Sequence, residues 1–180
     1  GTPMLFLPER TYQARLPKAK ALCTRPQAVF DGMLEVDGEA IAVDGWTGSE
    51  NHNWGRRHTD SYAWGQVVGF DGAPEAFLEC ATARLKLRPL WSPPMTIVCL
   101  RFAGHDYRLN SALQLFRAKG AWSDCDWRFD SAQAGVRIHG RIHAAPEDFV
   151  SVTYYNPPGG THPCLNSKLA ACEVTLERAG

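Results

Sequence analysis

The sequence has no excess of charge of either sign, and this absence excludes several classes of partner. Its 19 lysines and arginines balance 19 aspartates and glutamates, so the formal net charge at pH 7 is zero. We expect the two signs to be mixed along the chain. Proteins that bind nucleic acid or a membrane surface usually carry a basic patch. Neither kind of partner is therefore predicted.

Long apolar runs are also missing. A transmembrane helix needs a run of about 18 or more consecutive apolar residues. The sequence contains no such run, so no transmembrane segment is predicted. The opening residues, GTPMLFLPERTYQARLPKAKAL, lack the long apolar core of a signal peptide and contain prolines that would break one. The prediction is a cytoplasmic protein. Since the first residue is Gly1 rather than methionine, a processed, tagged or excised fragment is one interpretation.

No CxxC pair occurs, which argues against a zinc ribbon. Six cysteines could form three disulfides, but their apolar, strand-like surroundings favour buried free thiols in a reducing compartment. The cysteines are Cys23, Cys80, Cys99, Cys125, Cys164 and Cys172.

The composition and pattern predict one all-β domain. With 180 residues, of which 44% are hydrophobic, the chain can build a real core. Residues 1–28 contain four prolines and no sustained period, so we expect an extended arm or linker there. Residues 29–180 are expected to form the β domain.

Turn signals separate short strand-like segments. Asp37-Gly38 predicts a tight hairpin, because both residues tolerate positive φ. Asp71-Gly72 ends a second β-rich run, and Ala103-Gly104 lies between two apolar arms. Residues 75–90 alternate apolar and polar side chains, although helix is an alternative because Ala, Leu and Glu favour it.

Five further segments complete about nine or ten predicted strands, and no long helix is expected. In residues 122–129, Trp122, Asp124, Asp126 and Arg128 alternate with Ser123, Cys125, Trp127 and Phe129, which predicts one strand with a solvated face. So many antiparallel strands are expected to close into a barrel, which could hold a small apolar ligand. The five segments are residues 113–118, 122–130, 135–144, 148–156 and 167–178.

Metal and nucleophile chemistry fit the sequence poorly. His52 and His58 are separated by no usual ligand spacing, while His139 and His143 would lie about 13 Å apart along one strand face. No GxSxG elbow occurs, and Cys164 is two residues from His162 with no catalytic pairing set up locally. Neither a metal nor a cofactor is predicted.

Residues 44–66 combine acids with aromatic side chains. A carboxylic acid held in a dry pocket keeps its proton near neutral pH and can protonate an apolar substrate. Nearby aromatic faces would stabilise developing positive charge. The alternative is architectural: tryptophan and glycine often plug a barrel end. The acids are Asp44, Glu50 and Asp60, and the aromatics are Trp46, Trp54, Tyr62 and Trp64.

A second polar stretch follows the turn at Pro157–Gly160. Asn166 and Lys168 have strand spacing and share a face, so a strand with inward polar residues would place both in the lumen. The alternative is that Lys168 faces water.

Four motifs of the sequence resemble those of the tocopherol cyclase and hydroxyneurosporene synthase (carotenoid 1,2-hydratase) group of AttH-like, lipocalin-like proteins. The shared marks are Gly45-Trp46, His52-Asn53-Trp54-Gly55, Trp64 with Gln66, and residues 166–170. Members typically have two lipocalin-like barrel halves, and the resemblance covers residues 5–178 as the second half. In hydratase-like members an acid tends to precede the histidine, whereas here that residue is Asn51.

The resemblance implies an antiparallel, lipocalin-like (calycin-like) barrel that binds an isoprenoid- or polyketide-like molecule. It also implies cofactor-independent cyclisation or hydration. We expect His52, Asp60 and Glu50 to donate protons. Alternatives are a non-catalytic carrier, or a structural half that completes a homodimer or pairs with an N-terminal lipocalin-like half. The expected ligand-binding residues are Trp46, Asn53, Trp54, Tyr62, Trp64, Gln66, Tyr154, Asn166 and Lys168.

Overall fold

The computed structural model describes residues 2–87 and 89–179, and they form an all-β, antiparallel fold. Apart from the strands there are one short helix, α1 (Ala112–Arg117), and two 3-10 turns, η1 (Glu9–Thr11) and η2 (Pro146–Asp148). The strands are β1 (Ala19–Val36), β2 (Glu39–Gly55), β3 (Ser61–Phe70), β4 (Ala73–Arg84), β5 (Lys86–Leu87), β6 (Leu90–Trp91), β7 (Met95–Phe102), β8 (His105–Leu109), β9 (Lys119–Trp122), β10 (Asp126–Gln133), β11 (Val136–His143), β12 (Val150–Tyr155), β13 (Thr161–Asn166) and β14 (Ala171–Arg178).

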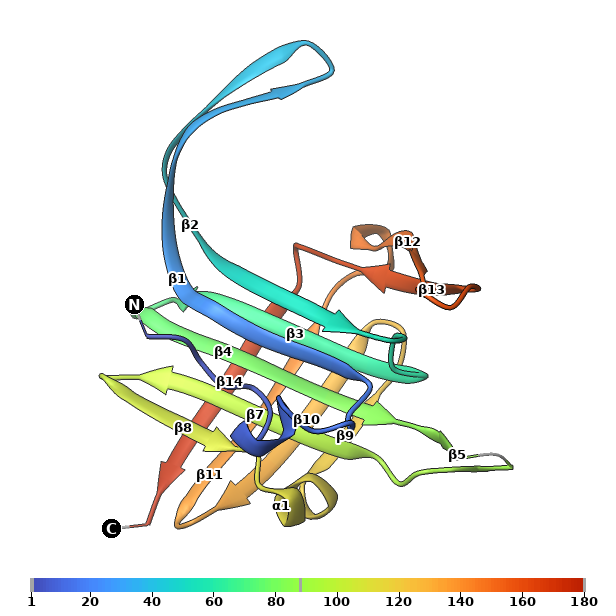
Figure 1. Ribbon diagram of the computed structural model, residues 1–180. Coiled ribbons are helices and arrows are strands. Elements are labelled where there is room, and N and C mark those ends of the chain that lie inside the picture. Colours follow the sequence, from blue (N-terminus) through green and yellow to red (C-terminus); the bar gives the residue numbers. More distant parts are fainter. Residues whose placement is uncertain (1, 88, 180) are drawn as a thin grey trace.

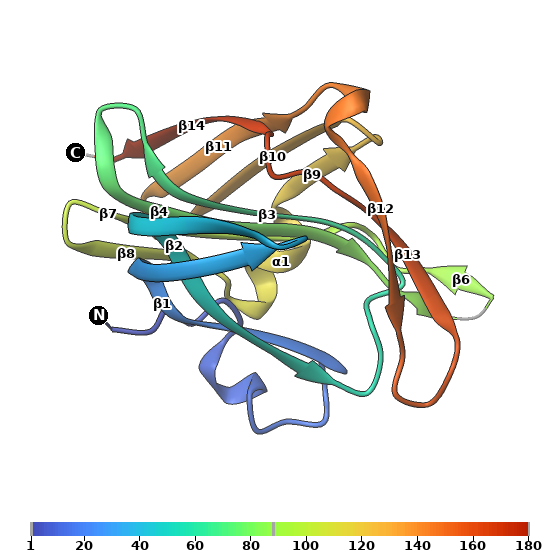
Figure 2. The same cartoon turned by 90° about the horizontal axis from the view of Figure 1, so that it is seen from above.

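The strands are arranged in three layers. A central sheet has the order β3-β4-β7-β8, and a second sheet has the order β14-β11-β10-β9. The N-terminal arm and the lower part of the β1–β2 hairpin cover the other face of the central sheet (Figures 1 and 2). Beyond the sheet the same hairpin curves away from the body of the molecule (Figure 1). The hairpins β5–β6 and β12–β13 form separate two-stranded sheets.

The tight turns are where the sequence predicts them. At Asp37-Gly38 both residues have positive φ, 53° and 83°, and Val36 pairs with Glu39 across the turn. This is the conformation that matches the twist of a hairpin. The predicted turns at Asp71-Gly72 and Ala103-Gly104 are also confirmed, between β3 and β4 and between β7 and β8.

One hydrophobic core lies between the two four-stranded sheets. Trp127, Phe129 and Ile138 of the outer sheet pack against the central sheet, and all three are at most 5% exposed. The central-sheet residues in this core are Leu78, Cys80, Val98, Leu100 and Leu109. Burial of these side chains is the main favourable contribution to holding the sheets together.

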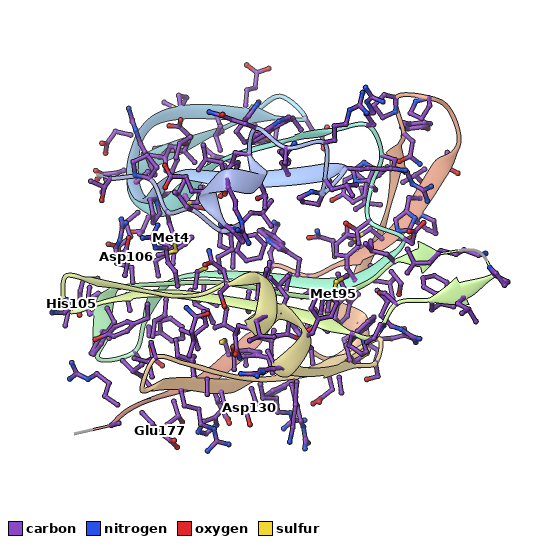
Figure 3. The ribbon with its side chains drawn as sticks, turned by 60° about the horizontal axis from the view of Figure 1, so that its bottom comes forward. Met4, Met95, His105, Asp106, Asp130 and Glu177 are labelled. Carbon is purple, nitrogen blue, oxygen red and sulfur yellow. The ribbon has the colours of Figure 1, made fainter. Side chains whose placement is uncertain are left out.

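A second core lies on the opposite face of the central sheet. Met4 and Phe6 from the arm and Cys23 from β1 pack on Phe77, Ile97 and Cys99. Figure 3 shows Met4 between the arm and the central sheet, and Asp130 and Glu177 on the far side of the second sheet. Since β4 is covered on both faces, residues 76–80 are all buried.

A small polar network lies inside the core between the sheets. The hydroxyls of Thr82 and Thr96 are 3.0 Å apart, and the indole Nε1 of Trp127 donates to Thr82 Oγ1 at 3.0 Å. Gly120 on β9 lies against both threonines, and a Cβ at this position would overlap their hydroxyl oxygens. The absence of a side chain at Gly120 therefore sets how closely β9 approaches the central sheet.

Two predicted strands are wrong. Residues 113–118 were expected to be a strand, but α1 occupies this segment. Ser111 caps the N-terminus of α1, because its hydroxyl accepts a hydrogen bond from the backbone N–H of Gln114. The expected strand over 122–129 is split by a turn between β9 and β10, in which Ser123 N donates to Asp126 O at 2.8 Å. The period of two was counted through Ser123 to Cys125, which form this turn, and was therefore misleading. Residues 75–90, where helix was an alternative, form most of β4 and the β5–β6 hairpin, apart from Arg88, which lies outside the described residues.

Two strand boundaries and the expected barrel closure differ from the sequence-based picture. β1 begins at Ala19, inside the expected arm of residues 1–28. β13 ends at Asn166, so Lys168 lies in the connection to β14 and not on a strand. None of the sheets formed by residues 2–87 and 89–179 closes on itself. Closure into a lipocalin-like barrel therefore stays a prediction. Within the same residues, no helix is long and apolar enough to cross a membrane.

Candidate functional site

The lower part of β2 is joined to the central sheet by a group of polar side chains. Gln66 on β3 and Asn51 on β2 exchange two amide hydrogen bonds, Nε2 to Oδ1 at 2.8 Å and Nδ2 to Oε1 at 3.1 Å. Ser49 Oγ also donates to Gln66 Oε1, at 2.5 Å. Asn51 is exposed and Gln66 is half-buried, so solvent reaches this edge of the interlayer space.

Glu79 is the register partner of Gln66 on the neighbouring strand β4. Its residue surface is only 1% exposed. One carboxyl oxygen, Oε1, accepts from Trp64 Nε1 at 3.2 Å, whereas Oε2 has no hydrogen-bond partner among the described residues. Burial raises the pKa of Glu79 from 4.5 to about 7, an effect that the indole hydrogen bond partly offsets. Glu79 is thus a carboxylic acid that holds its proton close to neutral pH.

The groups around Glu79 are protonated and weakly polar. Burial, followed by the negative charge of Glu79, raises the pKa of the Cys23 thiol to about 12, and the same two causes raise the pKa of Cys99 further. Burial also raises the pKa of the Tyr12 hydroxyl, with a smaller contribution from Glu79. Tyr12 donates to Ala21 O at 2.9 Å. No cation pairs with Glu79 among the described residues.

His52 and Trp54 lie on the opposite face of β2 from Asn51. Because side chains alternate along a strand, residues 49 and 51 face Gln66 and residues 50, 52 and 54 face away. His52 is exposed and stacks on Trp54 with ring centroids 5.2 Å apart, and Trp54 stacks on Tyr12 at 5.9 Å. The structure therefore does not bring His52 together with the interlayer carboxyl.

The other expected acids have structural partners. Glu50 is half-exposed and accepts from Thr24 Oγ1 at 3.0 Å, beside Arg25 at 3.6 Å. Asp60 accepts from the Arg57 guanidinium and from the backbone N–H of Lys86, at 3.0 Å for the latter, so it ties the loop before β3 to β5. Asp44 is exposed on the distal part of the hairpin.

The contacts of Asp60 predict that its substitution affects stability. Asp60→Asn should lower the free energy of unfolding by about 1 kcal/mol, because a charge-assisted hydrogen bond to Arg57 is weakened. His52→Ala should leave it nearly unchanged, since His52 is exposed. Urea denaturation of both variants checks this pair. Equal stability of Asp60→Asn and the native protein would contradict a structural role for Asp60.

Tyr62 and Tyr154, both expected ligand contacts, belong to a stack of aromatic rings beside the β12–β13 hairpin. His58 lies between Tyr154, at 4.9 Å between centroids, and His162, at 6.4 Å, and Tyr62 lies 6.2 Å from His162. His58 N donates to Asn156 Oδ1 at 2.8 Å. This stack joins the loop before β3 to the hairpin.

The remaining expected contacts are scattered. Trp46 is 49% exposed on the distal hairpin, and Asn53 is exposed opposite Ala21. Asn166 ends β13 and Lys168 is exposed beyond it. Only Trp64 and Gln66 of the expected contacts lie next to Glu79.

Metal ligation finds no support in the described part of the chain, which contains no group of three or more His, Cys, Asp or Glu side chains that could hold an ion. His139 lies 3.2 Å from Glu177 on the outer face of the second sheet. The six cysteines are free, as expected, but only Cys23, Cys80 and Cys99 are buried, whereas Cys125, Cys164 and Cys172 are half-buried.

Sequence reasoning missed Glu79. The alternation of residues 75–90 places it on one face with Phe77 and Ala81, but gives no reason to single it out. The usable signal was the apolar run around it, Ala76 to Ala81, which is typical of a strand buried on both faces. A glutamate inside such a run is a carboxylic acid shielded from solvent.

Comparison with known proteins gives relatives but no function. The chain is 26% identical over 176 residues to uncharacterized protein Rv0493c of Mycobacterium tuberculosis strain ATCC 25618 / H37Rv, and equally to uncharacterized protein MT0513 of strain CDC 1551 / Oshkosh. The aligned region is 98% of this chain but 53% of each relative. The chain thus spans about half the length of the curated relatives it matches. No known family and no solved structure matches it.

Proposed function

We propose that this protein binds an apolar, isoprenoid- or polyketide-like small molecule between the β1–β2 hairpin and the central sheet, and that Glu79 protonates it. The observation that carries the proposal is the Glu79 carboxyl itself, which is 1% exposed and has one oxygen without a partner among the described residues. Such a group costs several kcal/mol to bury, so its retention in a core favours a chemical role.

Three features support acid chemistry on an apolar substrate. The indole of Trp64 holds Glu79 Oε1 and offers an aromatic face that could stabilise a carbocation. The surroundings of Glu79 are thiols and apolar side chains, which exclude water. The exposed Asn51 and half-buried Gln66 mark the edge through which a ligand could enter when the hairpin moves.

The proposed step is balanced without a cofactor. The π electrons of a substrate alkene take the proton of Glu79, which forms a C–H bond and leaves a carboxylate and a carbocation. Water or a second double bond of the substrate then captures the cation. The proton released on capture or on elimination returns to the Glu79 carboxylate. The outcome is hydration or cyclisation.

The finer assignments belong to the same proposal. We place the fold with the lipocalin-like proteins, and the chain as one half of a two-half architecture, on the strength of Gly45-Trp46, residues 52–55 and the antiparallel sheets. The length of the curated relatives is compatible with a second half. A cytoplasmic location is supported by the six free cysteines.

The test uses farnesol as the isoprenoid probe, in buffer made with D2O. The native protein should incorporate deuterium at carbon, at a rate that falls as pH rises through about 7, because the acid form of Glu79 is lost there. Glu79→Gln should reduce the rate at least about 100-fold. Glu75→Gln, an exposed glutamate on the same strand, is the control. Binding of farnesol without deuterium exchange would replace the proposal with a carrier function, and absence of binding would overturn it entirely.

A further inference from the structure

The distal part of the β1–β2 hairpin, residues 29–46, exposes an unusual number of apolar side chains. Val29 and Met33 are 69% and 67% exposed. The other exposed large apolar residues of this segment are Phe30, Leu34, Val36, Ile41 and Trp46. Apolar side chains gathered so densely on a projecting element are typical of a protein contact.

This distal segment has free backbone edges as well. Apart from a bridge between Met4 and Cys23 near its base, the hairpin has no strand partner among the described residues, so the outer edges of residues 29–46 are unpaired there. A two-stranded hairpin is only marginally stable alone in water, and an exposed apolar edge invites pairing. The segment therefore needs a covering surface.

Charge along the hairpin is divided, which corrects the expectation that both signs are mixed. Residues 26–55 contain six acidic residues and no lysine or arginine, whereas residues 10–25 contain five basic residues and no acid. The acids are Asp31, Glu35, Asp37, Glu39, Asp44 and Glu50, and the basic residues are Arg10, Arg15, Lys18, Lys20 and Arg25. The tip of the hairpin is thus acidic, and its base lies beside a basic arm.

The outward side of the base also offers aromatic surface. His52 and Trp54 lie there, with Trp54 37% exposed. Lys20 is the strand partner of Trp54. A ligand for this region would be apolar and acidic, which is the character of the hairpin tip.

We propose that the hairpin is the interface with a second copy of this chain, in which two hairpins lie antiparallel about a two-fold axis. Each acidic, apolar tip then covers the basic, aromatic base of the partner copy. The contact is self-complementary, as a two-fold interface requires, and the charges attract on both halves.

The area is sufficient for a stable dimer. At about 3.3 Å per residue the 18 residues of β1 extend about 60 Å, and two strands span about 10 Å. One face of the hairpin therefore offers on the order of 600 Å² per copy, or about 1,200 Å² in total, which is the lower limit of standard specific interfaces.

Sedimentation equilibrium of the purified chain tests the proposal. We expect a mass of twice 19.9 kDa. Leu34→Lys with Ile41→Lys, which are strand partners on one face of the tip, should give a monomer. Leu87→Lys, at a still more exposed leucine of the β5–β6 hairpin, is the control and should stay dimeric. Circular dichroism checks that each variant is folded, which we expect because all three sites are exposed.

The electrostatic part has its own readout. Arg15→Glu with Lys18→Glu should lower the affinity of the dimer by about tenfold or more at low salt. The difference from the native protein should shrink in about 1 M salt, where a Debye length of ~3 Å screens the charges. A monomer at every concentration would overturn the proposal and point to a different covering surface, such as the additional half of the relatives. A dimer that survives the Leu34 and Ile41 substitutions would overturn it too.

Discussion

Glu79→Gln is expected to make the protein more stable than the native form above pH 7 by about 3 kcal/mol. In the native protein the folded pKa of Glu79 is about 7 and the ordinary value is 4.5. Between these values the folded state binds more protons than the unfolded state, so the free energy of unfolding falls as pH rises. Glutamine does not titrate, and the loss disappears. The interval from 4.5 to about 7 corresponds to about 3 kcal/mol.

Urea denaturation at a series of pH values from about 4 to about 8 measures this effect. Histidines also titrate in this window, so the informative quantity is the difference between the native protein and Glu79→Gln. Glu75→Gln should follow the native protein at every pH, because Glu75 is exposed. If the difference curve is flat from pH 4.5 to pH 8, Glu79 is not a buried acid. In that case the proposed proton donor is lost as well.

Gly120→Ala is expected to lower the free energy of unfolding by about 3 kcal/mol, through overpacking of the core between the sheets. The new methyl group would overlap the hydroxyl oxygens of Thr82 and Thr96. These hydroxyls cannot simply turn away, because Thr82 Oγ1 also accepts from the indole of Trp127. Removing this overlap would require β9 to move away from the central sheet. Thermal denaturation should show a large decrease in the melting temperature.

A double-mutant cycle identifies the cause of this loss. Thr82→Ala removes the nearest side-chain atoms facing Gly120. The pair Gly120→Ala and Thr82→Ala should therefore be less destabilising than the sum of the single changes. Ala121→Ser on the same strand is the control and should have little effect, because Ala121 is exposed. Additive effects in the cycle would mean that the strain arises elsewhere, for example in the backbone of β9.

The turns of this fold could be predicted because their signals are local. Asp37-Gly38 offers two residues that tolerate positive φ and Gly104 offers one, while Ala103 adopts a φ of 49° despite its Cβ. The antiparallel pairing follows directly from such hairpins. The number of strands was underestimated, because β9 was merged with β10 across the turn at Ser123 to Cys125 and the short strands β5, β6 and β13 were not predicted separately.

The candidate site could be predicted only in part, because it depends on contacts distant in sequence. Acid chemistry with aromatic neighbours was expected around residues 44–66, and Trp64 and Gln66 do lie beside a buried acid. The acid comes from β4, however, and its burial depends on layers that cover both faces of the strand. The apolar run from Ala76 to Ala81 indicates burial on both faces, but it does not specify which segments form the covering layers. The division of charge along the hairpin was visible in the sequence, but its meaning depends on the hairpin projecting from the body.

The alternation of side chains along β2 makes one strand serve two surfaces. Ser49 and Asn51 bind the central sheet, whereas His52 and Trp54 point outward. Every second residue is therefore constrained by a different neighbour. A single-residue insertion just before Ser49 would exchange the two sets, placing Glu50 against Gln66 and turning the amide of Asn51 toward solvent. We expect homologous chains to vary in length in the distal part of the hairpin, residues 29–46, and to keep the number of residues between positions 46 and 55 fixed.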